Sequence, residues 1–116
     1  MKIRRIVPDL ETDRLEESRD FYTNLIGLRV AMDLGWILTL RSPTSETAQL
    51  NLMIHDATAP VVPDISIEVA EVDAVYAEAL RRGEKIVHPL SDEPWGVRRF
   101  FVEDPNGIVV NVMSHR

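Results

Sequence analysis

Two short segments of the chain carry the same polar side chains in the same order. Residues 50–55 read LNLMIH and residues 110–115 read VNVMSH. The shared positions hold an amide, a thioether and an imidazole, namely Asn51 and Asn111, Met53 and Met113, and His55 and His115. An amide both donates and accepts hydrogen bonds, so the two asparagines suit an uncharged polar ligand. The alternative is that each amide only satisfies backbone groups at a bend in a sheet.

The spacing of the two segments indicates an internal duplication. The offset is 60 residues, about half of the 116-residue chain, which predicts two copies of one supersecondary unit. Within the first copy, Leu50, Leu52 and Ile54 alternate with Asn51, Met53 and His55, and a strand sends such sets to opposite faces. We expect the leucine face to pack on a helix. The asparagine and methionine face should line a concave ligand-binding surface.

Composition limits the class of protein. A chain of this length predicts a single domain, 1–116. It has no cysteine, which excludes disulfides, zinc–thiolate sites and cysteine nucleophiles. Its net charge of −6 argues against a nucleic-acid partner. No apolar run approaches the roughly 18 residues that span a bilayer, and the N-terminus lacks a signal-peptide core. We therefore predict no membrane partner and a cytoplasmic location.

The first module is predicted over residues 1–56. Its expected strands are 3–7, 28–32, 36–40 and 48–54, with a helix over 16–25. Pro8 is expected to limit the first strand. The helix should turn Leu15, Ser18, Phe21, Tyr22 and Leu25 to one face, and Gly27 follows it as a stop signal.

The second module is predicted over 64–116, after a linker over 57–63 that holds Pro60 and Pro63. Its expected strands are 65–69, 85–87, 97–103 and 108–114, with a helix over 72–82 that ends at Gly83. The tetrapeptide 104–107, Asp-Pro-Asn-Gly, predicts the last turn. The fold class is therefore α+β: two tandem βαβββ modules whose curved mixed sheets surround a concave cleft.

Further candidates for ligand contact lie outside the repeated strand. Trp36 and Trp95 each stand beside a glycine, one in each module, and an indole supplies a flat stacking surface. The alternative for both is core packing. Arg98 and Arg99 should point to opposite faces, so one of them could reach the concave side and bind an anionic group; the alternative is a surface charge paired with an acidic neighbour. Phe100 and Phe101 should divide in the same way. His88 precedes Pro89 and is expected to lie exposed in a loop.

Three segments resemble the vicinal oxygen chelate superfamily, which includes glyoxalase I, extradiol dioxygenases and bleomycin-resistance proteins. Residues 17–22 with 25–28, Glu-Ser-Arg-Asp-Phe-Tyr and Leu-Ile-Gly-Leu, are similar to the helix and helix-exit signature of that family. Residues 102–107 are similar to the final hairpin of that family, and residues 95–98 are similar to the segment before the hairpin. The resemblance implies the fold, and a homodimer as well. It does not specify the function, because this fold hosts both enzymes and binding proteins.

The resemblance also implies where a metal would bind. Metal-binding members place four inward-facing ligands, usually His and Glu, on the first and last strands of each module. Carried over one at a time, these positions fall near Ile6 or Val7, at Asn51, near Asp64 and at Asn111. Only Asp64 is a good ligand type, and two amides with one carboxylate make a poor divalent site. We therefore expect no metal and no other cofactor.

Two functions of different classes follow. The first is a metal-independent protein that binds a small molecule, an antibiotic or a metabolite, similar to bleomycin-resistance proteins. Its ligand would contact Asn51, Met53, Asn111, Met113, Asp64, Trp36, Trp95, Arg98 and Phe100. The alternative is a metal-dependent lyase, isomerase or dioxygenase with a relocated site built from Asp64, Glu68, His55 and His115. The two functions are distinguished by whether these four side chains converge on one point at metal-coordination distance. No catalytic residue is assigned from sequence.

Overall fold

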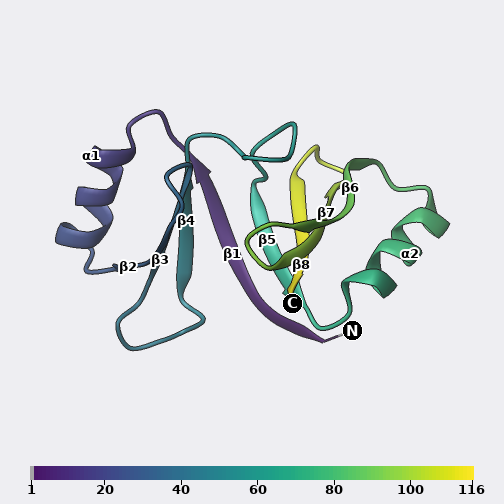
Figure 1. Cartoon of the computed structure of the whole chain (residues 1–116), viewed down its shortest axis with the longest axis horizontal. Helices are drawn as coiled ribbons and strands as arrows, with labels where there is room; N and C mark the ends of the chain where they lie inside the picture. Colours follow the sequence, from purple (N-terminus) through teal and green to yellow (C-terminus); the bar gives the residue numbers. More distant parts are fainter. Residues whose placement is uncertain (1) are drawn as a thin grey trace. The chain divides into compact units, whose positions relative to one another are not determined.

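A computed structural model describes residues 2–116 (Figure 1). Its elements follow the predicted order in both halves of the chain. The first half contains β1 (Ile3–Glu11), α1 (Leu15–Asp20), η1 (Phe21–Leu25), β2 (Arg29–Asp33), β3 (Ile37–Arg41) and β4 (Gln49–Met53). The second contains β5 (Ile65–Val69), α2 (Val72–Arg82), β6 (Ile86–Glu93), β7 (Val97–Glu103) and β8 (Val109–His115). The α+β class with two βαβββ modules is thus confirmed.

Contacts divide the chain into two compact units. The N-terminal unit is Val7–Val62, and the C-terminal unit is Pro63–Arg116 together with the residues up to Ile6. Strand order is β2-β3-β4-β1 in the first and β1-β5-β8-β7-β6 in the second, so β1 supplies residues to both. In each unit the first and last strands pair in parallel, whereas the β2–β3, β3–β4, β6–β7 and β7–β8 pairs are antiparallel. This shared pattern is what the duplicated sequence predicts.

Each unit packs a helix on one sheet face. In the N-terminal unit Leu38, Leu40 and Leu52 are buried, and Leu15 and Tyr22 of the helical segment pack on them. In the C-terminal unit the buried core cluster consists of Val69, Val72, Ala79, Phe100 and Val112. The alternate residues of the same strands therefore face away from the helix, and both repeated asparagines are among them.

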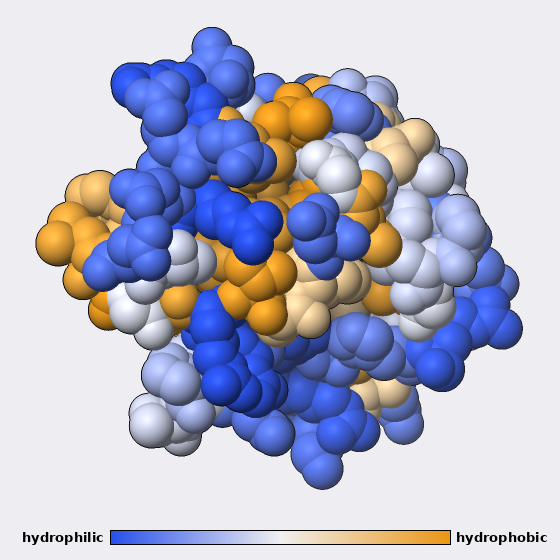
Figure 2. All heavy atoms as spheres, turned by 60° about the vertical axis from the view of Figure 1, so that its left-hand side comes forward, coloured by the Kyte–Doolittle hydropathy of each residue, from blue (hydrophilic) through white to orange (hydrophobic). Residues whose placement is uncertain are grey.

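The first helix changes its winding at Phe21. After α1 the chain continues as the π-helical turn η1, where the Ile26 amide donates to the Phe21 carbonyl at 3.2 Å. The extra residue in this turn rotates the face that the 3.6-residue period predicts. Phe21 and Leu25 are consequently exposed, which corrects their predicted place on the packed face. Figure 2 shows apolar side chains at the surface on this side of the molecule.

Two prolines do not end strands as predicted. Pro8 lies within β1, and the residues of β1 that pair with β4 begin just after it, at Asp9. Pro89 lies within β6, which the sequence predicted as only residues 85–87. The β6–β7 ladder shifts register between His88 and Ser91, so the residue without an amide donor falls at an irregularity. His88 is therefore in a strand and buried, and its predicted exposure in a loop is wrong.

The other boundaries lie within one or two residues of prediction, and α2, β5 and β7 match it. The last turn forms as expected, with Gly107 at φ 83° and its amide donating to the Asp104 carbonyl at 3.1 Å. In α2, the apolar side chain of Leu80 is exposed. Within residues 2–116 no helix is long and apolar enough to cross a bilayer.

Candidate functional site

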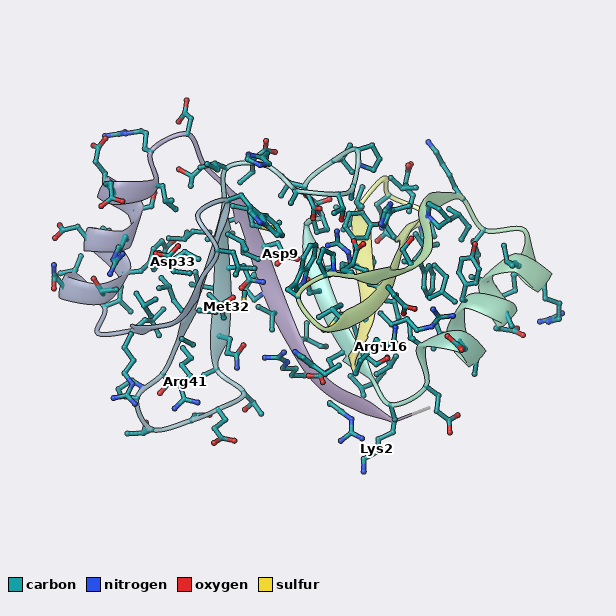
Figure 3. All side chains as sticks on the ribbon, viewed as in Figure 1. Lys2, Asp9, Met32, Asp33, Arg41 and Arg116 are labelled. Atoms are coloured by element: carbon teal, nitrogen blue, oxygen red, sulfur yellow. The ribbon has the colours of Figure 1, made fainter. Side chains whose placement is uncertain are left out.

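Asn51 is held between two neighbouring strands of the N-terminal unit. The ladders place it beside Asp9 of β1 and Thr39 of β3. Its Nδ2 donates to Asp9 Oδ1 at 2.7 Å, and the Thr39 hydroxyl donates to its Oδ1 at 2.6 Å. Figure 3 labels Asp9 on β1. The amide thus joins three strands on the face away from the helix, and both ends of the amide are hydrogen-bonded.

Asn111 occupies the equivalent place in the C-terminal unit but has a free acceptor. The ladders place it beside Ser66 of β5 and Phe101 of β7. Its Nδ2 donates to the Ser66 hydroxyl oxygen at 2.9 Å. Its Oδ1 is buried and accepts no hydrogen bond, and the whole residue is 8% exposed. A buried carbonyl oxygen without a donor costs about 1–3 kcal/mol.

The pairing also fixes which residues stand opposite the two asparagines. The first strands present Asp9 and Ser66, rather than Ile6 or Val7 and Asp64 as carried over from the resemblance. Asp64 instead accepts the Val109 amide at 2.8 Å through its carboxylate, while its own amide donates to the Val109 carbonyl. It joins the ends of β5 and β8.

Neither unit offers a donor set at these positions that fits a transition metal. In the N-terminal unit Asp9 and Asn51 supply a carboxylate and an amide, and in the C-terminal unit Ser66 and Asn111 supply a hydroxyl and an amide. Neither imidazole nor a second carboxylate is present, and these are the ligands that divalent first-row metals favour. Within residues 2–116 no three His, Cys, Asp or Glu side chains are grouped so that they could hold a metal ion.

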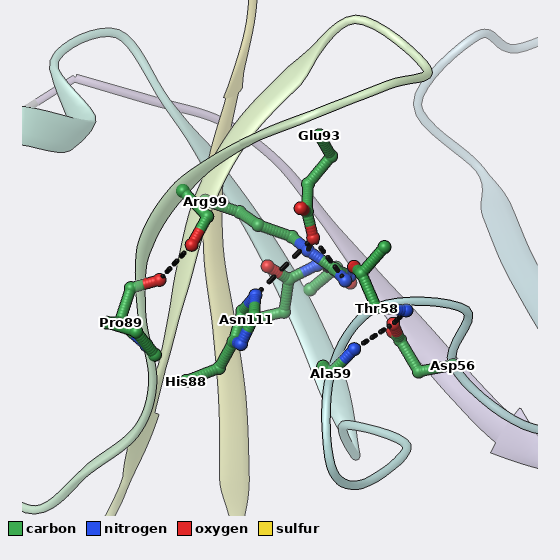
Figure 4. A network of polar contacts seen from close by, with 10 residues as sticks. Asp56, Thr58, Ala59, His88, Pro89, Glu93, Arg99 and Asn111 are labelled. Carbon is green, nitrogen blue, oxygen red and sulfur yellow. Dashed lines mark hydrogen bonds and ion pairs between the residues drawn. The ribbon is translucent and has the colours of Figure 1, made fainter.

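A buried charged cluster lies beside Asn111 (Figure 4). Arg99 of β7 is 3% exposed and donates from Nε and Nη2 to Glu93 Oε2, each at 2.7 Å. His88 Nε2 lies 3.4 Å from the same oxygen. Breaking a buried pair of this kind is costly because an unpaired charge is left behind. Arg99 and Glu93 therefore form a fixed polar wall beside the free amide oxygen.

Two aromatic rings enclose the Arg99 guanidinium. Its Cζ lies 4.9 Å from the centroid of the Trp95 ring and 4.7 Å from that of Phe101. Phe101 also contacts the His88 ring, with centroids 5.2 Å apart. Cation–π contacts of this type are favourable when the cation is desolvated. They give this face a mixed aromatic and polar character.

A second titratable group of the C-terminal unit lies further along the same face. Glu68 of β5 accepts from Arg5 Nε through Oε1 at 2.5 Å, and its Oε2 lies 2.9 Å from His115 Nδ1. Burial by itself raises the pKa of Glu68, but the hydrogen bonds with His115 and Arg5 and their positive charges outweigh it, so the pKa of Glu68 is lowered. Glu68 is thus held as a carboxylate.

The remaining predicted residues are dispersed. Trp36 stacks on His55 in the N-terminal unit, with centroids 6.3 Å apart. Arg98 pairs with Asp73 of α2 at 2.7 Å and with Asp92 at 3.0 Å, on the helix side of the sheet, and these hydrogen bonds raise the pKa of Arg98. Phe100 is in the core against Tyr76. Met53 and Met113 are buried on their strands.

The structure therefore brings Asn111, Met113 and Trp95 to one face of the C-terminal unit, together with residues that sequence reasoning missed. These are Ser66, His88 and Glu93, and they are joined by Arg99, one of the two arginines that the sequence left open for this face. The alternation of β7 carried part of the signal, because placing Phe100 against the helix assigns Arg99 and Phe101 to the opposite face. Its partner Glu93 had no such signal, because β6 was predicted to end before it.

Of the four residues proposed for a relocated metal site, only two meet. Glu68 and His115 contact each other. The Asp64 carboxylate accepts a hydrogen bond from the Val109 amide near the start of β5. His55 belongs to the N-terminal unit, where it stacks on Trp36. Two ligands are too few for a closed metal site.

Comparison with known proteins decides the family. The model of the Glyoxalase/Bleomycin resistance protein/Dioxygenase superfamily matches residues 2–112. The chain belongs to this superfamily. The predicted resemblance is thereby confirmed, and the superfamily description covers both enzymes and resistance proteins.

Solved structures of the superfamily show the same fold at low identity. A superfamily member from Vibrio splendidus 12B01 is 17% identical, with a TM-score of 0.73 over 97% of this chain and 99% of that chain. Methylmalonyl-CoA epimerase from Mycobacterium tuberculosis is 15% identical, with a TM-score of 0.69 over 99% of this chain and 88% of that chain. Homoprotocatechuate 2,3-dioxygenase from Brevibacterium fuscum is 23% identical, with a TM-score of 0.76 over 98% of this chain and 37% of that chain. A search of curated protein sequences finds no significant match.

Proposed function

We propose that this superfamily member is a metal-independent protein that binds a small molecule, an antibiotic or a metabolite. The observation that carries the proposal is the unsatisfied, buried Oδ1 of Asn111. At this position the resemblance leads one to expect a carboxylate that would bind a metal. The amide here can instead accept a hydrogen bond from a ligand.

The surroundings of Asn111 favour an uncharged ligand group. The nearby positive charge of Arg99 is already neutralised by Glu93. An anionic group would therefore find no unbalanced cation in this pair, and its desolvation would go uncompensated. A neutral N–H or O–H donor, such as an amide, a phenol or an alcohol, would satisfy the Asn111 oxygen at lower cost.

Apolar groups on the same face suit the body of such a ligand. Trp95 and Met113 belong to it, and Phe101 lies between Asn111 and His88 in the ladder. Small-molecule sites commonly combine an aromatic lining with a few fixed polar groups. We propose the equivalent Asn51 and Met53, with Trp36, as ligand-contacting residues of the N-terminal unit in their own right. Arg98, Phe100 and Asp64 already make contacts elsewhere and are less suited to the role.

A homodimer is part of the proposal. Its support is the superfamily resemblance. Light scattering coupled to size exclusion should give twice the chain mass of 13.2 kDa.

The binding proposal is tested by a ligand panel with a matched pair of variants. Uncharged aromatic amides and phenols are screened for a rise in melting temperature of the wild-type protein. Asn111→Leu removes the acceptor at similar volume, and Asn24→Ala alters an exposed asparagine. We expect the ligand-induced rise to be lost in the first variant and kept in the second. A rise that persists in Asn111→Leu, or a panel in which only metal-chelating compounds with added metal give a rise, would overturn the proposal.

A further inference from the structure

Glu68 and His115 form a carboxylate–imidazole pair whose outer nitrogen faces solvent. Glu68 Oε2 lies 2.9 Å from His115 Nδ1, and the His115 side chain is 53% exposed. A carboxylate next to Nδ1 selects the tautomer with the proton on that nitrogen. The lone pair of the neutral ring then lies on Nε2, on the side away from Glu68.

The carboxylate of this pair is itself held in place. Arg5 donates to its other oxygen, and the Glu68 side chain is only 13% exposed. The pKa of Glu68 is lowered, so Glu68 keeps its charge near neutral pH and can stabilise an imidazolium that forms beside it. An exposed imidazole backed by a fixed, partly buried carboxylate is an arrangement suited to proton transfer.

The end of β8 that carries His115 is also fixed. The Arg116 amide donates to the Gly96 carbonyl at 2.9 Å, and the Arg116 guanidinium pairs with Asp92 at 2.5 Å. His115 pairs with Val97 in the β7–β8 ladder. The imidazole is therefore carried by a paired strand and not by a free terminus.

The pair lies on the sheet face that carries the proposed ligand-binding residues of the C-terminal unit. Asn111, Met113 and His115 are alternate residues of β8 and share a face. Glu68 stands beside Met113 in the β5–β8 ladder. A ligand that hydrogen-bonds to Asn111 and extends along β8 over Met113 would reach His115.

We propose that Glu68 and His115 form an acid–base dyad that gives this protein a metal-independent proton-transfer activity. His115 Nε2 takes a proton from a weakly acidic C–H next to a carbonyl, and the bonding pair stays on the ligand as its enolate. Return of the same proton to another atom of the enolate completes an isomerisation without any co-reactant. His115 is the catalytic residue and Glu68 is a positioning residue. The inference rests on the proposed function only for the place of the natural ligand.

The test uses a probe that needs no knowledge of that ligand. A base removes the C3 proton of 5-nitrobenzisoxazole, the C–H pair forms the nitrile, and the N–O bond breaks to give a coloured phenolate. We expect the wild-type protein to accelerate this elimination and His115→Gln to reduce the protein-dependent rate by about tenfold or more. Glu68→Gln should reduce the rate as well, and Glu68→Asp should recover part of it. Asn24→Ala, at an exposed asparagine, is the control, and its rate should equal that of wild type.

A purely structural role for the pair predicts different results. The ¹⁵N chemical shifts of the His115 ring report its tautomer, and Glu68→Gln should weaken the preference for a proton on Nδ1. The melting temperature of each variant shows whether it is folded. The proposal is overturned if His115→Gln keeps the wild-type rate, or if Glu68→Gln does so while His115→Gln is slow. The ligand panel is repeated on His115→Gln. Loss of elimination with retained ligand binding supports both proposals, whereas elimination without any ligand binding contradicts only the proposed function.

Discussion

At the scale of single residues, the least expected feature is the buried charge of Arg99. A guanidinium that is 3% exposed requires a partner, and Glu93 supplies it from the neighbouring strand. The Trp95 and Phe101 rings supply the remaining surroundings of the cation. We interpret this cluster as the rigid wall that orients the Asn111 face, because each member is fixed by at least one other.

Replacing Glu93 should therefore cost far more stability than replacing a surface carboxylate. Glu93→Gln keeps the shape but leaves Arg99 without its counter-charge, and we expect the free energy of unfolding to fall by about 3 kcal/mol. Urea denaturation measures it. Glu78→Gln, which breaks the exposed pair of Glu78 with Arg81, is the control and should give no measurable change. Equal effects in the two variants would contradict the account of the cluster.

Glu68 predicts a specific dependence of stability on pH. Its pKa in the folded protein is lowered, so its contribution is fully present above the unfolded value of about 4.3 and is lost as pH falls through the folded value. The stability difference between wild type and Glu68→Gln should shrink as pH falls below about 4.3. Denaturation at a series of pH values measures it. A difference that does not decrease in acid would show that the ion pairs of Glu68 add nothing to stability.

At the scale of elements, α2 shows how local signals fix a boundary. Its last turn is closed by two backbone hydrogen bonds, from Gly83 to the Leu80 carbonyl and from Glu84 to the Ala79 carbonyl. Gly83 has φ 72°. This left-handed conformation is unfavourable for any residue that carries a Cβ. The helix therefore ends where the sequence predicts.

Gly83→Ala should destabilise the protein by about 1 kcal/mol, because alanine must adopt that left-handed conformation. No heavy atom lies within 4 Å of the added Cβ, so the cost is conformational and not a clash. Thermal and urea denaturation measure it. Gly83→Asn is the matched control, since asparagine tolerates this conformation better, and its loss should be clearly smaller. The reverse order would contradict the assignment of the cap.

The elements that sequence predicts well are those with clean periodicity and local end signals. Strand β5 alternates without interruption, and β7 is followed by the Asp104–Gly107 turn, so both match their predictions. Strand β6 fails because Pro89 is a local signal for a loop, whereas the ladder with β7 tolerates it at a register shift. The prediction that Phe21 packs on the sheet fails because the π-helical turn changes the period within the helix.

The candidate site was only partly predictable for the same reason. Asn111 and Met113 follow from the duplication alone. Their partners depend on pairing between distant strands: Ser66 requires the β5–β8 register, and Glu93 requires β6 to extend past Pro89. No local sequence pattern fixes these registers, because they follow from tertiary packing.

At the scale of the whole molecule, the two units share an architecture but differ in the residues that stand opposite the repeated asparagine. Both units keep a parallel pair of first and last strands with an asparagine at the same place. The residues opposite are Asp9 and Ser66, so neither unit supplies two strong metal ligands there. We therefore propose that amide groups and aromatic rings recognise the ligand and that His115 transfers the proton.

The most direct test of this account is the metal content of protein purified without chelator and without a metal-affinity tag. Elemental analysis is combined with melting curves in the presence of Ni²⁺, Zn²⁺, Mn²⁺ and Fe²⁺, because a ligand that binds the folded state raises the melting temperature. The account predicts far less than one metal ion per chain and no rise with any of the four ions. A content of about one metal ion per chain, or a rise with one ion that Asn111→Leu removes, would contradict it.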